Sequence, residues 1–431
     1  MQRPVFAALI LPLLLGACVS VAAPTDTLDA AARDYVRLQM AIGQKEEGYI
    51  DAYFGPADLA ALGKAEGTAQ NLPTLAARVD ALQARIVAIA AASPAAEPRR
   101  ARFLAAQLTA ARTRLRMLSG EKLSFQDEAE GLFGVRPELR PLTSYQPTLD
   151  RVEKLVPGKG TLADRVEAFR DRFVIPNARL DSVMRTATAE CKARTARYIT
   201  LPPSERFELA FVRGKSWSGY NYYLGDYASR IEINTDLPVR IERAVDLGCH
   251  EGYPGHHVLN LLLERRLVRE RGWTEFSVNP LYSPQSIISE GSANYGYDLA
   301  FPGPQRLAFE TGTLYPLAGL KADDAGAYEA LQKALRDLGS ARFTVAADFL
   351  DGRVDEAETV RRLQRYQLIG EARARQSLAF IKQYRSYVIN YGLGRDMVAA
   401  DVERAGTDEK ARWARMEQIL SEPTLPSDLR R

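Results

Sequence analysis

Histidine is scarce in this sequence of 431 residues: there are only three, and all lie between positions 250 and 257. A serine or cysteine nucleophile is usually activated by a neighbouring imidazole, and the rest of the chain has none to offer. A serine or cysteine hydrolase site elsewhere in the chain is therefore excluded. Imidazole is also the commonest metal ligand among side chains, so keeping the whole supply in one segment indicates chemistry there.

Basic blocks are missing as well. The formal net charge is +3, and no lysine–arginine block alternates with aromatic residues, so nothing supports a nucleic-acid partner. With 46% hydrophobic and 26% charged residues, the chain has an ordinary globular composition. We expect residues 18–431 to form one large, two-lobed domain.

The chain also lacks a long apolar run outside its start. The run from Val5 to Leu15 is too short to span a membrane and follows Arg3, which is typical of a secretory signal peptide at residues 1–17. Leu15–Cys18 resembles a bacterial lipobox, which implies cleavage before Cys18 and acylation of its thiol. Val19 in the next position implies sorting to the outer membrane. We therefore expect an exported lipoprotein, facing the periplasm or the cell surface and held by an N-terminal lipid anchor. Ordinary signal cleavage after Ser20–Ala22 is the alternative.

Cysteine is too rare for a disulfide scaffold. If Cys18 is acylated, Cys191 and Cys249 remain, and one disulfide is possible in an oxidising compartment. Cys249 directly precedes His250, which makes Cys249 a candidate metal ligand. On a helix its side chain would point about 100° away from that of His250, which favours buried packing instead.

The segment His250–His257 reads His-Glu-Gly-Tyr-Pro-Gly-His-His. It resembles the HExxH arrangement of zinc peptidases, in which a helix presents two imidazoles to the metal and the glutamate acts on a bound water. The six-residue offset from His250 to His256 would separate the two rings by about 120° on a regular helix. Pro254 and Gly255 predict a kink or bulge that brings them together. His257 is nearly in phase with His250 but two turns further along.

Residues beyond this segment complete the candidate site. Ser283 and Pro284 predict the start of a helix that carries Glu290, the expected third ligand, among small and apolar neighbours. A buried carboxylate is costly unless a cation offsets its charge. Asn294, one turn on, is expected to support it. A buried glutamate paired with an arginine is the alternative. One turn before His250, Asp246 is a candidate to orient that imidazole.

The remaining patterns predict a mainly helical fold with a small antiparallel sheet, of the α+β class. Residues 18–200 read as a helical N-terminal region that includes a helix pair at Leu75–Ala91 and Arg99–Leu118. Residues 201–300 combine the small sheet with the metal-site helices, and residues 301–431 form a helical C-terminal region. In the last region, the segment 384–392 is rich in groups that hydrogen-bond an oxyanion, with Tyr391 as the candidate. Amphipathic helix packing explains the same segment equally well.

Together, His-Glu-Gly-Tyr-Pro-Gly-His-His and the later Ser-Glu-Gly-Ser-Ala resemble a bacterial family catalogued as domain of unknown function 885. The resemblance implies a mostly helical, zincin-like fold related to helical gluzincin peptidases. In those enzymes the second ligand directly follows a glycine, which favours His256 over His257. In zinc peptidases of the HExxH kind, an edge strand beside the active-site helix pairs with the substrate, and Ser229–Asn234 resembles that strand. The family's tryptophan after Glu-Gly is Ser292 here.

The leading hypothesis is a zinc metallopeptidase. His250, His256 and Glu290 would hold Zn²⁺, Glu251 would act as general base, and His257 or Tyr391 would stabilise the oxyanion. An inactive lipid-anchored binding protein is one alternative, although a purely structural metal site needs no free Glu251. A two-histidine, one-carboxylate iron oxygenase is another. We expect a peptide or oligopeptide substrate; its length, the cleavage position and the oligomeric state do not follow from the sequence.

Overall fold

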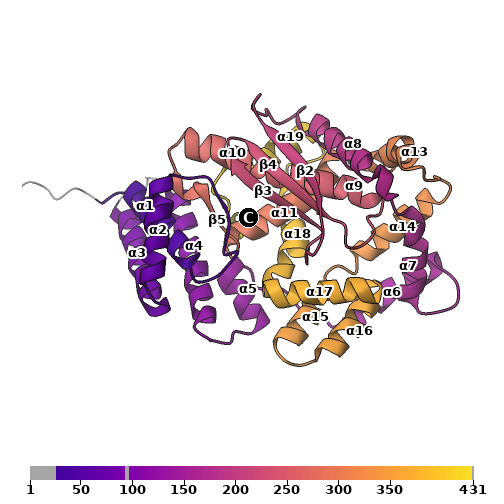
Figure 1. The fold of residues 1–431 in the computed structure, drawn as a ribbon, viewed down its shortest axis with the longest axis horizontal. Helices are drawn as coiled ribbons and strands as arrows, with labels where there is room; N and C mark the ends of the chain where they lie inside the picture. The colour runs from indigo at the N-terminus through magenta and orange to yellow at the C-terminus, as the bar shows by residue number, and fades with distance from the viewer. Residues whose placement is uncertain (1–25, 93–96, 430–431) are drawn as a thin grey trace, which may run out of the picture.

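The structure, a computed structural model, describes residues 26–92 and 97–429 of the chain. The expected signal peptide at 1–17 and the acylation site Cys18 lie outside these residues. Within the described ranges the chain is mainly helical with two small sheets, which confirms the predicted fold class (Figure 1). None of the described helices is both long enough and apolar enough to cross a bilayer.

The first helices pack together as a group. α3 (Leu72–Ala92) and α4 (Pro98–Leu118) form the predicted helix pair, and α1 (Leu28–Ile42) packs against both. α1 begins where Thr27 accepts a hydrogen bond from the backbone N–H of Ala30 at 3.2 Å. The apolar positions of α3 recur at three- and four-residue spacing, so one face of the helix is buried. These positions are Leu75, Val79, Leu82 and Ile86.

The three-stranded sheet is mixed rather than antiparallel throughout. β3 (Gly219–Gly225) and β4 (Ala228–Asn234) form an antiparallel hairpin, whereas β2 (Arg206–Val212) runs parallel to β4 on its other side. The connection formed by residues 213–218 leaves a gap one strand wide between β2 and β3, and β4 later occupies this gap. Strand propensity reports which residues are extended but not which strands become neighbours, so the predicted all-antiparallel pairing was wrong. A second, two-stranded antiparallel sheet pairs β1 (Ile50–Tyr53) with β5 (Val278–Pro280).

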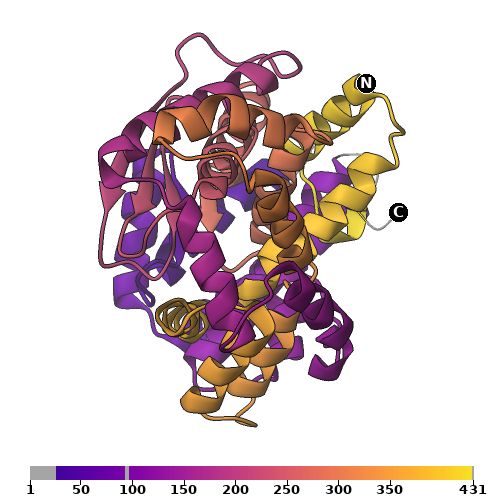
Figure 2. The same ribbon diagram turned by 90° about the vertical axis from the view of Figure 1, so that its right-hand side faces the viewer.

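Two long helices pack closely at the centre of the molecule. α11 (Pro284–Ala300) lies against α18 (Ile389–Glu403), although the two are about a hundred residues apart in the chain (Figures 1 and 2). A Cβ atom on Gly291 would overlap the backbone of Gly394, and one on Gly394 would overlap the carbonyl oxygen of Ile287. Glycine at both positions therefore lets these helices approach closely, and this close approach determines which side chains of α11 and α18 reach the site.

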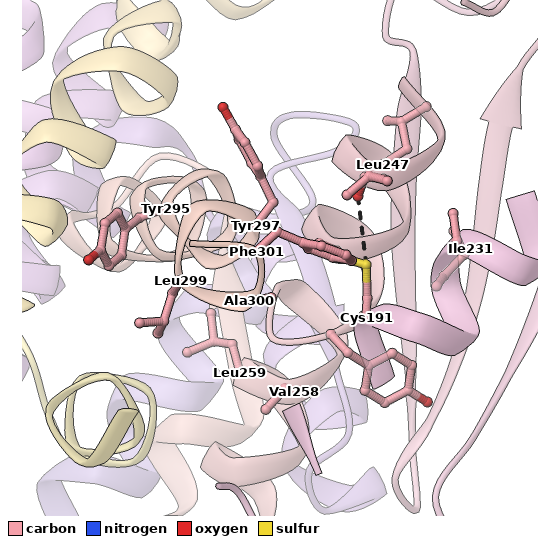
Figure 3. Close-up of a cluster of buried hydrophobic side chains, with 14 of the residues drawn as sticks. Cys191, Ile231, Leu247, Val258, Leu259, Tyr295, Tyr297, Leu299, Ala300 and Phe301 are labelled. Carbon is pink, nitrogen blue, oxygen red and sulfur yellow. Dashed lines mark hydrogen bonds between the residues drawn. A yellow bond between two sulfur atoms is a disulfide. The ribbon is translucent and has the colours of Figure 1, made fainter. Parts of the chain in front are cut away.

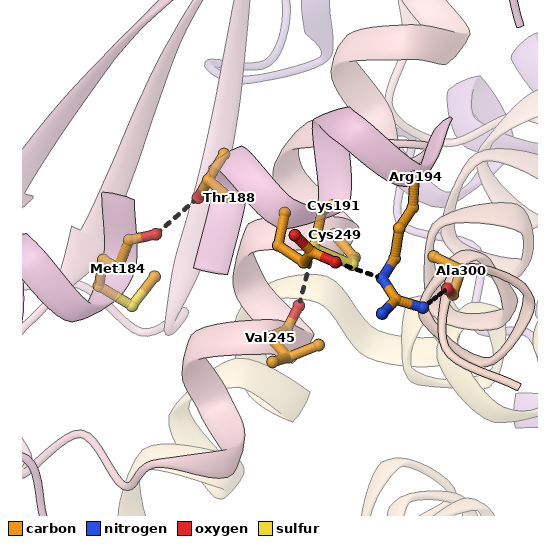
Figure 4. Close-up of a disulfide and its surroundings, with 8 residues drawn as sticks. Met184, Thr188, Cys191, Arg194, Val245, Cys249 and Ala300 are labelled. Carbon is orange, nitrogen blue, oxygen red and sulfur yellow. Dashed lines mark hydrogen bonds and ion pairs between the residues drawn. A yellow bond between two sulfur atoms is a disulfide. The ribbon is translucent and has the colours of Figure 1, made fainter. Parts of the chain in front are cut away.

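A large apolar core joins the sheet to the helices around the histidine segment. Figure 3 shows part of this core, with Ile231 of β4, Leu247, Val258 and Phe301 drawn together with Cys191. Cys191 of α8 (Asn177–Thr195) forms a disulfide with Cys249 (Figure 4). Arg194, one turn further along α8, donates to the carbonyl oxygen of Ala300 at 3.0 Å. α8 is thus attached both to the histidine segment and to the end of α11.

The remaining helices cover this framework. In Figure 1, α15–α17 lie on the side of α18 opposite the three-stranded sheet. The helices not bounded so far are α2 (Ala57–Ala69), α5 (Phe125–Phe133), α6 (Gln146–Leu155), α7 (Leu162–Arg170), α9 (Glu242–Leu247), α10 (His256–Leu262), α12 (Gln305–Phe309), α13 (Tyr315–Ala318), α14 (Ala325–Arg336), α15 (Ala341–Leu350), α16 (Glu356–Gln367), α17 (Glu371–Tyr384), α19 (Glu409–Ser421) and α20 (Pro426–Leu429). The shorter helical segments are η1 (Leu142–Tyr145), η2 (Asp171–Phe173), η3 (Gly248–Gly252), η4 (Leu263–Arg269), η5 (Thr274–Ser277), η6 (Glu310–Leu314) and η7 (Arg385–Val388).

Candidate metal centre

The two histidines are separated by a break in the helix, as the sequence predicted. α9 widens into the π-helical segment η3, which carries His250 and Glu251; the helix then stops, and α10 begins at His256. Across the break the backbone folds back onto η3. A Cβ atom on Gly255 would overlap the carbonyl oxygen of His250, so only glycine fits at this position.

The break brings three ligand atoms together. Nε2 of His250 lies 3.1 Å from Nε2 of His256, 3.3 Å from Oε2 of Glu290 and 3.9 Å from Oε1 of Glu251. Nε2 of His256 lies 3.7 Å from the same Glu290 oxygen. Although buried, this Glu290 oxygen makes no hydrogen bond in the described structure. One proton can bridge only two of the three facing atoms, whereas a cation between them would satisfy all three.

These distances suit a tetrahedral zinc site. With ligands about 2.0–2.1 Å from the ion, neighbouring ligand atoms in a tetrahedron are about 3.4 Å apart. The measured separations of 3.1, 3.3 and 3.7 Å bracket this value. Two imidazole nitrogens and one carboxylate oxygen are the donor set of catalytic zinc sites, which keep a fourth position open. The residues present therefore fit Zn²⁺.

Each of two ligands is held by a further hydrogen bond. Nδ1 of His256 lies 2.9 Å from the hydroxyl of Ser289, which leaves Nε2 directed at the centre. The hydroxyl of Tyr387 donates to Oε1 of Glu290 at 2.8 Å, which leaves Oε2 free. Burial alone would lower the pKa of His250, but the carboxylates of Glu251 and Glu290 raise it to about 9. Burial lowers the pKa of His256 to about 4, so this ring is neutral near pH 7 and able to bind a metal.

Glu251 lies beside the ligand atoms and borders the cavity. Its side chain makes no ion pair with an arginine or lysine in the described structure, and burial raises the pKa of its carboxyl to about 7. The amide of Asn221 in β3 donates to the backbone carbonyl of Glu251 at 2.7 Å, which holds this turn of η3 against the sheet. A general base works best when its pKa lies near the operating pH.

Tyr391 lies on the α18 side of the site. Its ring is nearly parallel to that of His250, with the centroids 6.3 Å apart, and it borders the same cavity. Burial raises its pKa well above the usual value, so the hydroxyl stays protonated and can donate a hydrogen bond. Asn294 donates to the backbone carbonyl of Tyr391 at 3.2 Å. Asn294 thus holds α18. The expectation that it supports the Glu290 carboxylate was wrong.

The structure places His257 outside this group. The ring is fully buried on the far side of α10, where Nδ1 lies 2.8 Å from the hydroxyl of Ser229 and Nε2 lies 2.9 Å from Glu205. His257 is not among the cavity-lining residues. Successive helical side chains diverge by about 100°, so His256 and His257 cannot face the same ion. This position corrects the expectation that His257 contacts the oxyanion.

Two further expectations change. Asp246 pairs with Arg243 and, within the described structure, makes no hydrogen bond to His250. β4 lies between β2 and β3, so its backbone is paired on both sides and Ser229–Asn234 cannot take up a substrate strand. The edge strand that borders the cavity is β3, where residues 219–221 line it. Adjacent strands in a hairpin look alike in sequence, so the edge was assigned to the wrong one.

The site opens into a cavity of about 430 Å³, within the usual size range of ligand pockets. Several cavity residues were not singled out from the sequence. Asp51 accepts a hydrogen bond from Tyr220, and burial raises the pKa of its carboxyl to about 6. Arg342 and Arg373 come from α15 and α17. No local motif marks these residues, because they reach the cavity only through packing of distant elements.

Comparison with known proteins finds structural likenesses, among them a candidate lipoprotein and a carboxypeptidase. No family model and no curated protein matches the chain, so the resemblance to family 885 rests on the motifs alone. A candidate lipoprotein from Colwellia psychrerythraea is 18% identical over 94% of this chain and 75% of that chain, with a TM-score of 0.49. An M32 carboxypeptidase from Deinococcus radiodurans R1 is 13% identical over 91% of this chain and 88% of that chain, with a TM-score of 0.41. At these levels, neither likeness extends to an activity or to individual residues.

Proposed function

We propose that the protein is a zinc-dependent peptidase with a zincin-like arrangement of its metal ligands. The observation that carries the proposal is the convergence of Nε2 of His250, Nε2 of His256 and an oxygen of Glu290 that makes no hydrogen bond, at a cavity wall with Glu251 beside them. A structural zinc site would be closed by a fourth protein ligand. Here, only three ligand atoms converge among the described residues, and the cavity provides room for a substrate.

The reaction would use residues already in place. Zinc bound by His250, His256 and Glu290 would polarise the peptide carbonyl and lower the pKa of a water molecule. Glu251 accepts the proton of the attacking water and passes it to the leaving amine. The hydroxyl of Tyr391 donates a hydrogen bond to the oxygen on which negative charge develops.

The edge strand β3 would align the substrate. An extended peptide can pair with an unpaired strand edge, so its backbone supplies binding energy without a sequence requirement. β3 passes close to the general base, because a Cβ atom on Gly219 would lie 2.7 Å from Oε1 of Glu251. A peptide paired with β3 would therefore present its backbone next to Glu251.

We also propose export and an N-terminal lipid anchor. The lipobox at Leu15–Cys18 motivates the anchor. The Cys191–Cys249 disulfide supports an oxidising compartment such as the periplasm. Mass spectrometry of the membrane fraction should find a diacylated or triacylated Cys18. An unmodified N-terminus at Ala23 would contradict the anchor.

Metal analysis followed by digestion of a peptide library tests the activity. We expect about one zinc per chain and cleavage that stops when a chelator removes the metal. Glu251→Gln should keep the zinc but lower hydrolysis by about 10²–10⁴-fold, because the amide cannot accept the proton. Glu270→Gln is a suitable control, since this exposed carboxylate pairs only with surface arginines. Full zinc occupancy with no cleavage of the library would contradict the proposal and favour a binding protein.

A further inference from the structure

Three arginines border the cavity, and they differ in their partners. Arg243 pairs with Asp246, and Arg373 lies 3.8 Å from Glu167 and donates to the carbonyl oxygen of Pro238 at 2.8 Å. Arg342 has no carboxylate within 4.0 Å in the described part of the chain, and its solvent-shielded Nε has no hydrogen-bond acceptor. One positive charge at the cavity wall is therefore left without an opposite charge.

The fold gives little reason for this charge. A partly buried cation without an anionic partner is disfavoured, and Arg342 lies partly buried in the first turn of α15, where the helix dipole also disfavours a cation. Burial lowers the pKa of the Arg342 guanidinium from its usual value, and Tyr391 acts in the opposite direction. The guanidinium lies 5.2 Å from the ring centroid of Phe380, and this cation–π contact offsets only part of the unfavourable free energy of partial burial.

Aromatic rings connect Arg342 with the metal centre. Phe380 packs edge-on against Tyr391 with centroids 6.0 Å apart, and Tyr391 lies parallel to His250. The acidic groups Glu251 and Glu290 are at the other end of this row. The cavity thus has a negative end that suits a metal ion and a positive position that suits an anion.

We propose that Arg342 binds a carboxylate of the substrate. The inference rests on the proposed peptidase function and specifies its substrate class: a peptide that carries either a free C-terminal carboxylate or an acidic side chain near the scissile bond. A guanidinium matches a carboxylate in charge and can form two parallel hydrogen bonds with it. The bound carboxylate would supply the partner that the protein itself does not provide.

Binding to an inactive enzyme tests this without relying on turnover. Zinc-loaded Glu251→Gln protein is titrated by calorimetry with three peptides: a free acid, its C-terminal amide, and the same amide with its last residue replaced by glutamate. We expect at least one carboxylate peptide to bind about 10–100-fold more tightly than the neutral amide. The free acid and the glutamate amide distinguish a terminal from a side-chain carboxylate.

The arginine itself is tested in the same background. Glu251→Gln/Arg342→Gln should lose the preference for the carboxylate while binding the neutral amide as before, and Arg342→Lys should retain part of it. Arg361→Gln is the matched control, because this arginine is 65% exposed and pairs with Glu358 outside the cavity. A structural role for Arg342 would instead lower the unfolding temperature and weaken all three peptides equally.

Three outcomes would overturn the proposal. One is equal binding of the acids and the neutral amide; another is no binding of any peptide. The third is a carboxylate preference that survives Arg342→Gln, which would place the carboxylate on the metal instead. If Arg342→Gln does not fold, Arg342→Met, which keeps much of the side-chain volume without the charge, decides the third outcome. A carboxylate preference that depends on Arg342, in a wild-type protein that cleaves nothing, would support this site and contradict the peptidase function.

Discussion

His256 and His257 are adjacent in the chain but lie in two different kinds of polar cluster. Nε2 of His256 faces His250 and Glu290 at a cavity, where one carboxylate oxygen makes no hydrogen bond. Both nitrogens of His257 have partners, and Glu205 in that cluster is also contacted by Tyr253 and Lys192. One cluster leaves lone pairs unsatisfied towards an open space; the other is closed.

The difference shows how a functional cluster can be separated from a structural one. Both clusters contain a buried histidine and a glutamate whose side chain is shielded from solvent, so residue type and burial do not distinguish them. What differs is whether the protein satisfies its own polar atoms. We therefore expect changes in the first cluster to affect metal binding and catalysis, and changes in the second to affect stability.

The largest contrast should appear in zinc affinity. His250→Ala, His256→Ala and Glu290→Ala should each weaken zinc binding by about 10²–10³-fold, if about 12 kcal/mol of binding free energy is shared over the three protein ligands. His257→Ala should keep the metal, because its ring points to Ser229 and Glu205. Competition with a chromophoric chelator measures both effects. Zinc loss in His257→Ala together with retention in His256→Ala would show that the two assignments are reversed.

The reverse contrast should appear in stability. His257→Ala should lower the free energy of unfolding of the metal-free protein by about 3 kcal/mol, because it leaves Glu205 buried without its imidazole partner. His256→Ala should cost less than half as much, since its removal also relieves the packing of two facing imidazoles. Urea unfolding in the presence of a chelator measures the difference and keeps metal binding out of it. Equal losses would remove the distinction between the clusters.

A smaller effect is expected for the hydroxyl that supports a ligand. Tyr387→Phe removes the donor to Oε1 of Glu290 and should weaken zinc binding by about 10-fold. Tyr391→Phe is the matched control: it removes a hydroxyl from the same wall, but no hydrogen bond to a ligand, and should leave zinc affinity unchanged. Isothermal titration of both variants with zinc compares them. Equal affinities would show that Tyr387 does not orient Glu290.

The smallest effect is a pH dependence within the closed cluster. Burial acts to raise the pKa of Glu205, but hydrogen bonds from His257, Lys192 and Tyr253 lower it from 4.5 to about 2. A carboxyl with a lowered folded-state pKa stabilises the fold above the unfolded-state pKa and loses that contribution as pH falls through the folded-state value. In metal-free protein, the stability advantage of wild type over Glu205→Gln should therefore shrink by about 1–2 kcal/mol between pH 4.5 and pH 2. A constant difference over this window, measured by thermal unfolding, would contradict the lowered pKa.

Several features followed from the sequence because they depend on neighbours in the chain. Pro254 and Gly255 predicted the helix break, and the break is present. Apolar spacing predicted the α3–α4 pair, and the fold class is confirmed. The clustering of all three histidines beside Glu251, and the position of Glu290 among small and apolar neighbours, indicated a metal site. The structure brings the three expected ligand atoms together, while the metal itself remains a prediction.

Other features depend on contacts between distant segments. Strand order decided that β3, not β4, is the edge strand at the cavity. The rotation of about 100° between successive helical residues directs His257 away from the metal site and towards Glu205. Arg342, Tyr387 and Asp51 reach the site from elements separated by up to several hundred residues, so no local pattern identifies them.

The sequence by itself determined the chemical composition of the site and the local breaks that shape it, because proline, glycine and side-chain chemistry act over a few residues. Only the tertiary structure decided which polar atoms are left without partners. The pairing of these atoms depends on the close approach of α11 and α18 at Gly291 and Gly394. It also depends on which face of α10 packs against the sheet. Pairing and burial are properties of neighbours in space, and these neighbours are far apart in the chain.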